Sequence, residues 1–238
     1  MSEATEDYLK VIYTLQATEG KVTTSALARR LGVAPASVSG MLAKLAKQGL
    51  INHRRYQGAV LTSEGRLRAL QVIRRHRLAE LWLRRILGLP LHRVHDEAHK
   101  LEHALSDEVA SRLDELLEHP ERDPHGTPIP TADGRLVTDS VTPLAEVAVG
   151  QSVVIREVCD DDPAAVRFLE ERGLLPAVRI EVIARQPCDG PFTLRVGQDE
   201  HILGLNITRQ ILVEIDPDLD RNISEPPGSV FSSDQEES

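Results

Sequence analysis

The chain has 238 residues, a formal net charge of −9, and 41% hydrophobic but only 3% aromatic residues. This length allows one to three small domains with aliphatic cores. The N-terminus has no basic-then-apolar leader, and no apolar run is long enough to cross a bilayer, so we expect a cytoplasmic protein without a membrane partner. Cys159 and Cys188 lack a pairing framework, and no disulfide is expected.

Charge is distributed unevenly along the chain. Residues 1–75 contain 12 Lys and Arg against 5 Asp and Glu, a net charge of +7, whereas the remainder has 16 basic and 32 acidic residues, a net charge of −16. A basic head on an acidic body predicts that only the N-terminal part binds a polyanion.

The basic part predicts a helix-turn-helix. Hydrophobic residues at helical spacing indicate a helix over residues 3–18, and a short helix over 25–31 can be capped by Thr23 or Thr24. A third helix is expected over 35–48. A short helix, a tight turn and a second helix form the helix-turn-helix pattern, in which the second helix enters the major groove of DNA.

The expected recognition helix begins with small side chains, which allow close approach to base edges. No Arg or Gln is placed to read a base with two hydrogen bonds, so DNA shape is expected to contribute to recognition. Residues 50–61 predict a hairpin wing whose tip can contact phosphate. The residues expected to contact DNA are Thr24, Pro35, Ala36, Ser37, Ser39, Lys44, Arg54, Arg55 and Tyr56.

Three more helices are expected after the wing. The first begins at residues 62–64 and ends before 88–90, the second lies between Pro90 and Ser106, and the third runs from Ser106 to before Pro120. Their apolar stripes are wide enough for both a core and a partner, so these helices predict a dimerisation module.

The second of these helices carries many potential metal ligands, spaced three and four residues apart and therefore on one helix face. They are His95, His99, Glu102 and His103. On the preceding helix, His76 and Glu80 form another pair four residues apart, and facing helices commonly supply a shared metal site. Solvated polar faces are the alternative, but two such sets on consecutive helices favour metal binding.

The C-terminal part changes character. Residues 119–143 are rich in Pro, Gly and Asp and predict a loop or linker, in which Asp123 and His125 are further candidate ligands. One helix is expected over 163–172, and the tail after Pro217 is expected to be disordered. Short strands that suggest a small β-barrel are expected at residues 153–155, 179–183, 192–196 and 211–215.

These segments together resemble the diphtheria-toxin-repressor family of metal-dependent transcriptional regulators, and within it the manganese-responsive branch. The resemblance covers about residues 3–216 and is most specific in residues 75–80 (RHRLAE), 94–108 (VHDEAHKLEHALSDE) and 123–130 (DPHGTPIP). It implies a mainly α fold with a small β domain. The expected parts are a winged helix-turn-helix at 1–62, a helical dimerisation and metal-binding domain at 63–140, a C-terminal SH3-like (FeoA-like) barrel at 141–216 and an acidic tail at 217–238.

The resemblance also implies which residues hold the regulatory metal. Glu102 and His103 match the Glu-His pair of the regulatory site. Asp7 falls where iron-responsive members have Met and manganese-responsive members have Asp. His99 falls where iron members have Cys and manganese members often have Glu.

A second, ancillary metal site is implied as well. His76, Glu80 and His95 match its ligands, although the manganese branch counts His76 with the regulatory site. Some members of that branch draw ancillary ligands from positions matched here by three further residues. These are Asp123, which replaces a Cys of those relatives, His125 and Asp160.

The ligand types indicate the metal. No Cys or Met falls at an expected ligand position, and carboxylate with imidazole suits Mn(II) and Fe(II). We therefore expect Mn(II), with Fe(II) as the alternative. Zn(II) also binds His, so affinity alone does not separate it.

The sequence as a whole predicts a homodimeric, metal-activated regulator that binds a palindromic double-stranded operator and represses metal-uptake genes. A metal that joins Asp7 to Glu102 and His103 would lock the DNA-binding domain against the dimerisation domain. Two alternatives are a DNA-binding protein with a purely structural metal, and a metallohydrolase. The chain has no nucleophile motif, so we do not expect an enzyme.

Overall fold

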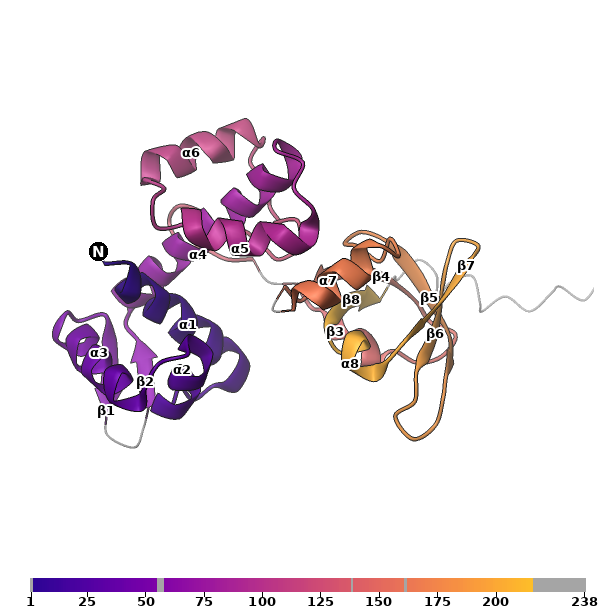
Figure 1. Ribbon diagram of the computed structural model, residues 1–238, viewed down its shortest axis with the longest axis horizontal. Coiled ribbons are helices and arrows are strands. Elements are labelled where there is room, and N and C mark those ends of the chain that lie inside the picture. The colour runs from indigo at the N-terminus through magenta and orange to yellow at the C-terminus, as the bar shows by residue number, and fades with distance from the viewer. Residues whose placement is uncertain (1, 55–57, 138, 161, 216–238) are drawn as a thin grey trace, which may run out of the picture. The chain divides into compact units, whose positions relative to one another are not determined.

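The structure is a computed structural model that describes residues 2–54, 58–137, 139–160 and 162–215 (Figure 1). The chain divides into two compact units. The first combines Met1–Asp139 with Asp160–Glu170, and the second combines Ser140–Cys159 with Glu171–Ser238. The segment after Cys159 therefore packs with the N-terminal unit, although the sequence places it inside the β domain.

The first unit begins with the expected helix-turn-helix. The helices are α1 (Glu3–Glu19), α2 (Thr24–Leu31) and α3 (Pro35–Lys47). Thr23, rather than Thr24, caps α2 by accepting a hydrogen bond from the Ala26 N–H. The wing follows as the antiparallel pair β1 (Ile51–Arg54) and β2 (Gly58–Leu61). Its tip, with Arg55 and Tyr56, lies outside the described residues, as does the tail expected after Pro217.

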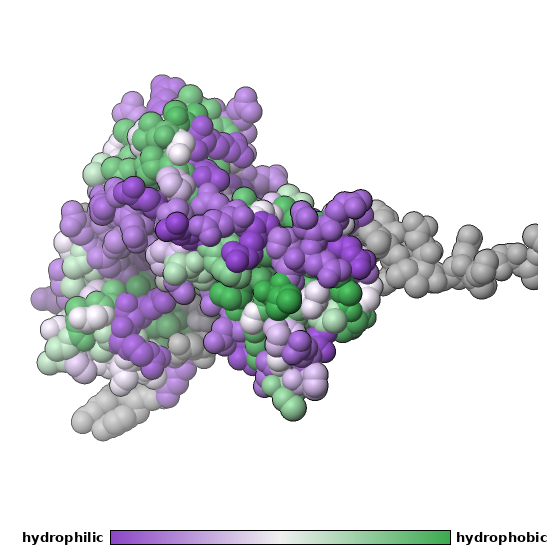
Figure 2. Space-filling view, turned by 45° about the vertical axis from the view of Figure 1, so that its right-hand side comes forward, coloured by the Kyte–Doolittle hydropathy of each residue, from purple (hydrophilic) through white to green (hydrophobic). Residues whose placement is uncertain are grey.

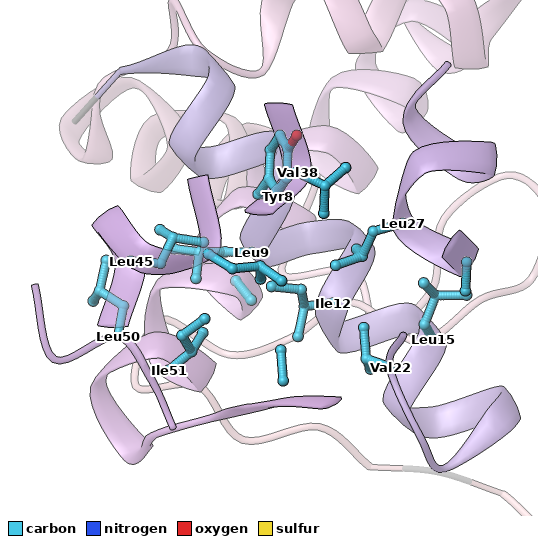
Figure 3. Close-up of a cluster of buried hydrophobic side chains, with 14 of the residues drawn as sticks. Tyr8, Leu9, Ile12, Leu15, Val22, Leu27, Val38, Leu45, Leu50 and Ile51 are labelled. Carbon is cyan, nitrogen blue, oxygen red and sulfur yellow. The ribbon is translucent and has the colours of Figure 1, made fainter. Parts of the chain in front are cut away.

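One aliphatic core holds these helices and the wing together. Leu9 and Ile12 of α1 face Leu27 of α2 and Leu45 of α3, and Ile51 of β1 lies below them (Figure 3). All five side chains are buried, so burial of apolar surface fixes the angle between the recognition helix α3 and the wing.

Three helices follow the wing, at nearly the expected bounds. They are α4 (Ser63–Arg85), α5 (Leu91–Leu101) and α6 (Asp107–Leu116). Ser106 caps α6 by accepting from the Val109 N–H, as expected. The helix α5, however, ends at Leu101 and not near Ser106, so that Glu102 is its C-cap and His103 lies in the following turn.

The loop after α6 is packed rather than a solvated linker. Asp123 and His125 are buried, and the Asp123 N–H donates to the Thr127 carbonyl. Arg74 and Arg77 of α4 donate to the carbonyl oxygens of Pro130 and Pro128. The loop is thus fastened along α4, which brings its polar side chains into the protein interior.

The helix α7 (Pro163–Glu170) packs against α5. The Glu170 carboxylate accepts from the Leu91 N–H at the start of α5, and it pairs with Arg84 and His92. A carboxylate at a helix N-terminus is favourable because it meets unpaired N–H groups. This contact anchors the segment that begins with Asp160.

The second unit is an antiparallel sheet of six strands in the order β3-β8-β4-β5-β6-β7. Its strands are β3 (Thr142–Pro143), β4 (Ser152–Val158), β5 (Arg179–Arg185), β6 (Phe192–Val196), β7 (Asp199–Leu203) and β8 (Ile211–Ile215), with η1 (Leu144–Glu146) and α8 (Leu205–Thr208) as short helical turns. The sequence did not predict β3 or β7. The segment β3 has only two residues, and β7 is polar, with Asp199 and Glu200 exposed.

Among the described residues, no helix is long and apolar enough to span a membrane.

Gly65 tests the junction between the wing and α4. A Cβ at this position would lie 1.9 Å from the Leu50 carbonyl oxygen, which accepts from the Thr62 N–H and hydroxyl. Gly65→Ala should therefore lower the free energy of unfolding by roughly 2–3 kcal/mol, because the backbone must shift. Chemical denaturation would measure this loss.

Gly40→Ala is the matched control, because nothing lies within 4 Å of a Cβ added there in α3. It should leave stability unchanged or raise it by up to about 1 kcal/mol, since Ala favours helix over Gly. Equal stability of the two variants would contradict the close packing of α4 on the wing.

Candidate metal centre

Four potential ligands from two parts of the first unit meet at one place, here called the A cluster. They are Asp7, His99, Glu102 and His103, and one ligand atom from each lies within 4.8 Å of all the others. His103 Nε2 is 2.9 Å from Asp7 Oδ1 and 3.4 Å from Glu102 Oε1, and His99 Nδ1 is 3.1 Å from the same Glu102 oxygen. Because Asp7 belongs to α1, the cluster joins the first helix to the end of α5, as expected from the sequence.

The turn after α5 explains how the cluster is assembled. Glu102 is fully buried, and Arg75 of α4 donates from Nε to the Glu102 carbonyl oxygen at 2.9 Å. His103 Nδ1 is 2.8 Å from Glu6 Oε2, and Arg75 pairs with the same Glu6 oxygen at 3.0 Å. A carboxylate on the far nitrogen of a histidine orients the ring and raises its basicity as a metal ligand.

Lys10 and His76 hold the other Glu102 oxygen. Lys10 Nζ is 2.7 Å and His76 Nδ1 is 2.5 Å from Glu102 Oε2. Burial alone would raise the pKa of Glu102, but the His76 hydrogen bond and the Lys10 charge lower it to about 2. Burial likewise opposes the raised pKa of His103, which follows from its hydrogen bond to Glu6 and from the charges of Glu102 and Asp7. The cluster thus has a carboxylate ready to bind a cation at neutral pH.

A second group of four ligands lies between α4, α5 and the start of the α7 segment, and is called the B cluster. It comprises His76, Glu80, His95 and Asp160. His95 Nδ1 is 2.9 Å from Asp160 Oδ2 and 3.2 Å from Glu80 Oε1, and His76 Nε2 is 3.0 Å from that Glu80 oxygen. The position of Asp160 depends on α7, which Glu170 anchors to α5.

Glu80 also belongs to a third group, called the C cluster, with Asp123 and His125. All three residues are buried, and the nearest ring nitrogen of His125 is 3.8 Å from Glu80 Oε1. Within the described part of the chain, Glu80 Oε2 and both ring nitrogens of His125 have no hydrogen-bond partner. Buried polar atoms are normally satisfied, so unpaired imidazole and carboxylate atoms within one group of potential ligands fit a bound metal ion.

The charges of the B and C clusters are strongly coupled. Burial lowers the pKa of His95, but its hydrogen bonds to Asp160 and Glu80 raise it to about 10. Burial and the neighbouring Glu80 charge raise the pKa of Asp123 to about 8, although Arg77 lies 3.5 Å away. In the metal-free protein, the inner carboxylates are thus balanced by protons that a divalent cation would replace.

His76 connects the clusters. Its Nδ1 faces Glu102 of the A cluster and its Nε2 faces Glu80 of the B and C clusters. Burial opposes protonation, but the Glu80 charge and the hydrogen bonds to Glu102 and Glu80 raise its pKa. This position agrees with the two assignments that the sequence left open for His76.

The ligands expected on one face of α5 do not gather at a single place. Four residues of helix rise by about 6 Å, so His95 and His99 reach different groups of partners. His95 turns to Asp160 and Glu80, and His99 turns to Glu102. Glu102 and His103 reach the A cluster from the turn, because α5 ends at Leu101.

Three residues that the sequence did not single out contact these clusters. Lys10, Glu6 and Arg75 each contact Glu102 or His103. Lys10 lies three residues after Asp7 on α1 and shares its helix face, a signal that could have found it, whereas Glu6 is adjacent to Asp7 and had no such signal.

Six of the residues expected to meet DNA lie on α2 and α3 of the helix-turn-helix. Pro35, Ala36, Ser37, Ser39 and Lys44 of α3 are exposed, and Thr24 is half-buried at the start of α2. Arg54 ends β1. The exposed N-terminal part of α3 can therefore approach base edges, as a recognition helix does.

Comparison with known proteins agrees with this architecture. The family model "Iron dependent repressor, N-terminal DNA binding domain" matches residues 1–59, "Iron dependent repressor, metal binding and dimerisation domain" matches 62–131, and "FeoA domain" matches 142–215. The fold expected from the sequence is confirmed by these matches.

Relatives and solved structures agree with the family models. The diphtheria toxin repressor of Corynebacterium diphtheriae is 39% identical over 204 residues, which cover 81% of this chain and 88% of that protein. The iron-dependent repressor IdeR of Mycobacterium tuberculosis is 32% identical over 197 residues, covering 76% and 84%. A solved manganese-dependent transcriptional repressor in complex with manganese is 38% identical, with a TM-score of 0.83 over 88% of this chain and 99% of that chain.

These matches span most of the chain and of the relatives, and they set the metallohydrolase alternative aside because the family consists of repressors. The chain therefore belongs to the diphtheria-toxin-repressor family and is a metal-dependent transcriptional repressor.

Proposed function

We propose that this protein is a manganese-responsive repressor whose A cluster joins the DNA-binding helix-turn-helix to the dimerisation helices. The observation that carries the proposal is the meeting of Asp7 from α1 with Glu102 and His103 after α5. A switch requires an interaction that differs between two conformational states. A cation held by Asp7 and Glu102 together would exist only when the two parts are correctly apposed.

The three clusters would hold two ions, one regulatory and one ancillary. In the A cluster, Asp7, His99, Glu102 and His103 would hold the regulatory ion, and Glu6 and Arg75 orient His103 and the turn. In the B and C clusters, His95, His125, Asp123, Asp160 and the shared Glu80 would hold the ancillary ion. A bound divalent ion would supply positive charge that neutralises these carboxylates.

Ligand chemistry supports Mn(II), with Fe(II) as the alternative. The gathered atoms are carboxylate oxygens and imidazole nitrogens, without thiolate or thioether, and hard oxygen donors suit Mn(II). Among similar structures, one is described as a manganese-dependent repressor in complex with manganese, and another, ScaR, as bound to Zn²⁺ at a TM-score of 0.75 and 32% identity. Selectivity must therefore come from coordination geometry and metal availability.

A homodimer is supported by exposed hydrophobic residues of the helical module. Ile86 and Leu87 after α4, and Val109 and Leu116 of α6, are each 44% exposed or more. The helix α6 lies at the top of Figure 1, and the top of the surface in Figure 2 includes hydrophobic residues. A two-fold dimer presents two α3 helices, which supports a palindromic operator with half-sites about one helical turn apart.

The first prediction concerns coupling between Asp7 and Glu102. Asp7→Ala and Glu102→Ala should each lower Mn(II)-stimulated operator affinity at least about tenfold, and the double variant should be no worse than the worse single one, because residues that share one ion are not additive. Fluorescence anisotropy of labelled operator DNA, titrated with Mn(II), measures this. Additive losses would mean that the two residues do not share an ion.

The second prediction concerns the C cluster. His125→Ala should remove one Mn(II) per chain, because both its nitrogens lack a protein partner. His119→Ala is the matched control, since His119 is exposed and pairs with Asp114 outside the clusters. Equilibrium dialysis with Mn(II) would count the ions, and equal stoichiometry in both variants would exclude His125 as a ligand.

The third prediction concerns pH. His95, whose pKa is raised to about 10, carries a proton at neutral pH in the metal-free protein, and the pKa of His103 is raised as well, but a metal binds only neutral imidazole. Mn(II) binding at pH 7 should therefore release about one proton or more per ion, and affinity should fall as pH falls. Calorimetry in buffers of different ionisation enthalpy measures this release, and a pH-independent affinity without proton release would contradict the assignment.

A further inference from the structure

Lys10 contacts the A cluster, although it is not one of the four potential metal ligands. Its ammonium lies 2.7 Å from Glu102 Oε2, and Glu102 is fully buried while Lys10 is 20% exposed. Lys10 belongs to α1 and Glu102 to the turn after α5. The ion pair therefore joins the same two parts of the first unit that a metal at this cluster would join.

The Glu102 carboxylate is oriented without Lys10. His76 lies 2.5 Å from the same oxygen, and Arg75 holds the Glu102 carbonyl. His99 and His103 face the other oxygen, Oε1. The geometry thus leaves Lys10 a mainly electrostatic role.

An ammonium cannot ligate a metal, because it has three N–H donors and no lone pair. While it stays on Oε2, it blocks two-oxygen binding of an ion by Glu102 and places a positive charge beside this ligand. Its long flexible stem and partial exposure give the ammonium a path to solvent.

We infer that the Lys10 ammonium acts as an internal cation for Glu102 in the metal-free protein and thereby lowers the affinity of the A cluster for divalent metal. Lys10 leaves the carboxylate when an ion binds. The residue sets the metal concentration at which the A cluster fills. This inference rests on the proposed metal role of the A cluster.

The experiment is a direct Mn(II) titration of the full-length protein by electron paramagnetic resonance, which follows the free ion. A background with both His95→Ala and His125→Ala removes a ligand from each of the B and C clusters and leaves the A cluster intact. Lys10→Met removes the charge and keeps a side chain of similar length, and Lys10→Gln is a second neutral variant. Lys10→Arg keeps the charge, and Lys47→Met removes one from an exposed position on α3.

Both neutral variants should bind Mn(II) roughly tenfold more tightly, which corresponds to the loss of one competing charge pair worth about 1.4 kcal/mol. Lys10→Arg and Lys47→Met should match the parent protein. The melting temperature of the metal-free protein should fall in Lys10→Met, and its rise on adding Mn(II) should be larger than in the parent, because only the metal-free state loses a partner of Glu102.

Unchanged or weaker binding in both neutral variants would overturn the inference, since Lys10 would then only position Glu102 or do nothing. Tighter binding in Lys10→Arg as well would also overturn it, because the charge would not be the cause. Failure of the parent protein to bind Mn(II) at the A cluster would overturn the proposed function itself. This outcome differs from equal Mn(II) affinities of the parent and the neutral Lys10 variants, which would overturn only the role of Lys10.

Discussion

The rest of this structure depends on one buried carboxylate, that of Glu102. It is fully buried, and its two oxygens face Lys10 and His76 on one side and His99 and His103 on the other. A charge that is removed from water needs ion-pair or hydrogen-bond partners nearby. The protein is destabilised where such a partner is missing. The residues that pair with the Glu102 charge come from α1, α4 and the end of α5. Their contacts with this one carboxylate therefore hold these three parts of the chain together.

The long helix α4 connects the wing to the ligand clusters. Its first turn packs on Leu50 beside the wing, and its later residues His76 and Glu80 belong to the ligand clusters. His76 faces Glu102 with one nitrogen and Glu80 with the other, so an ion bound in one cluster would change the charge beside the other cluster. Coupling between sites requires such a shared physical element.

Much of this arrangement could be predicted from the sequence, because local signals are strong there. The caps, Thr23 or Thr24 and Ser106, and the periodicity of α4 predicted helix bounds within a few residues. The ten candidate ligands, of which Asp160 was implied only by the family resemblance, lie in three groups. The end of α5 at Leu101 was not predictable, because no glycine or proline marks it. Neither was the burial of Asp123 and His125, since a loop rich in Pro and Gly normally lies at the surface and only its contacts with α4 reveal otherwise.

The central claim is that one ion is held jointly by Asp7 of α1 and by Glu102 after α5. The most direct measurement is an anomalous difference map, at the manganese absorption edge, from crystals of the Mn(II)-loaded protein. A shared ion should give a peak in direct contact with carboxylate oxygens of both Asp7 and Glu102. A peak that contacts only one of them, or no peak beside either, would contradict it.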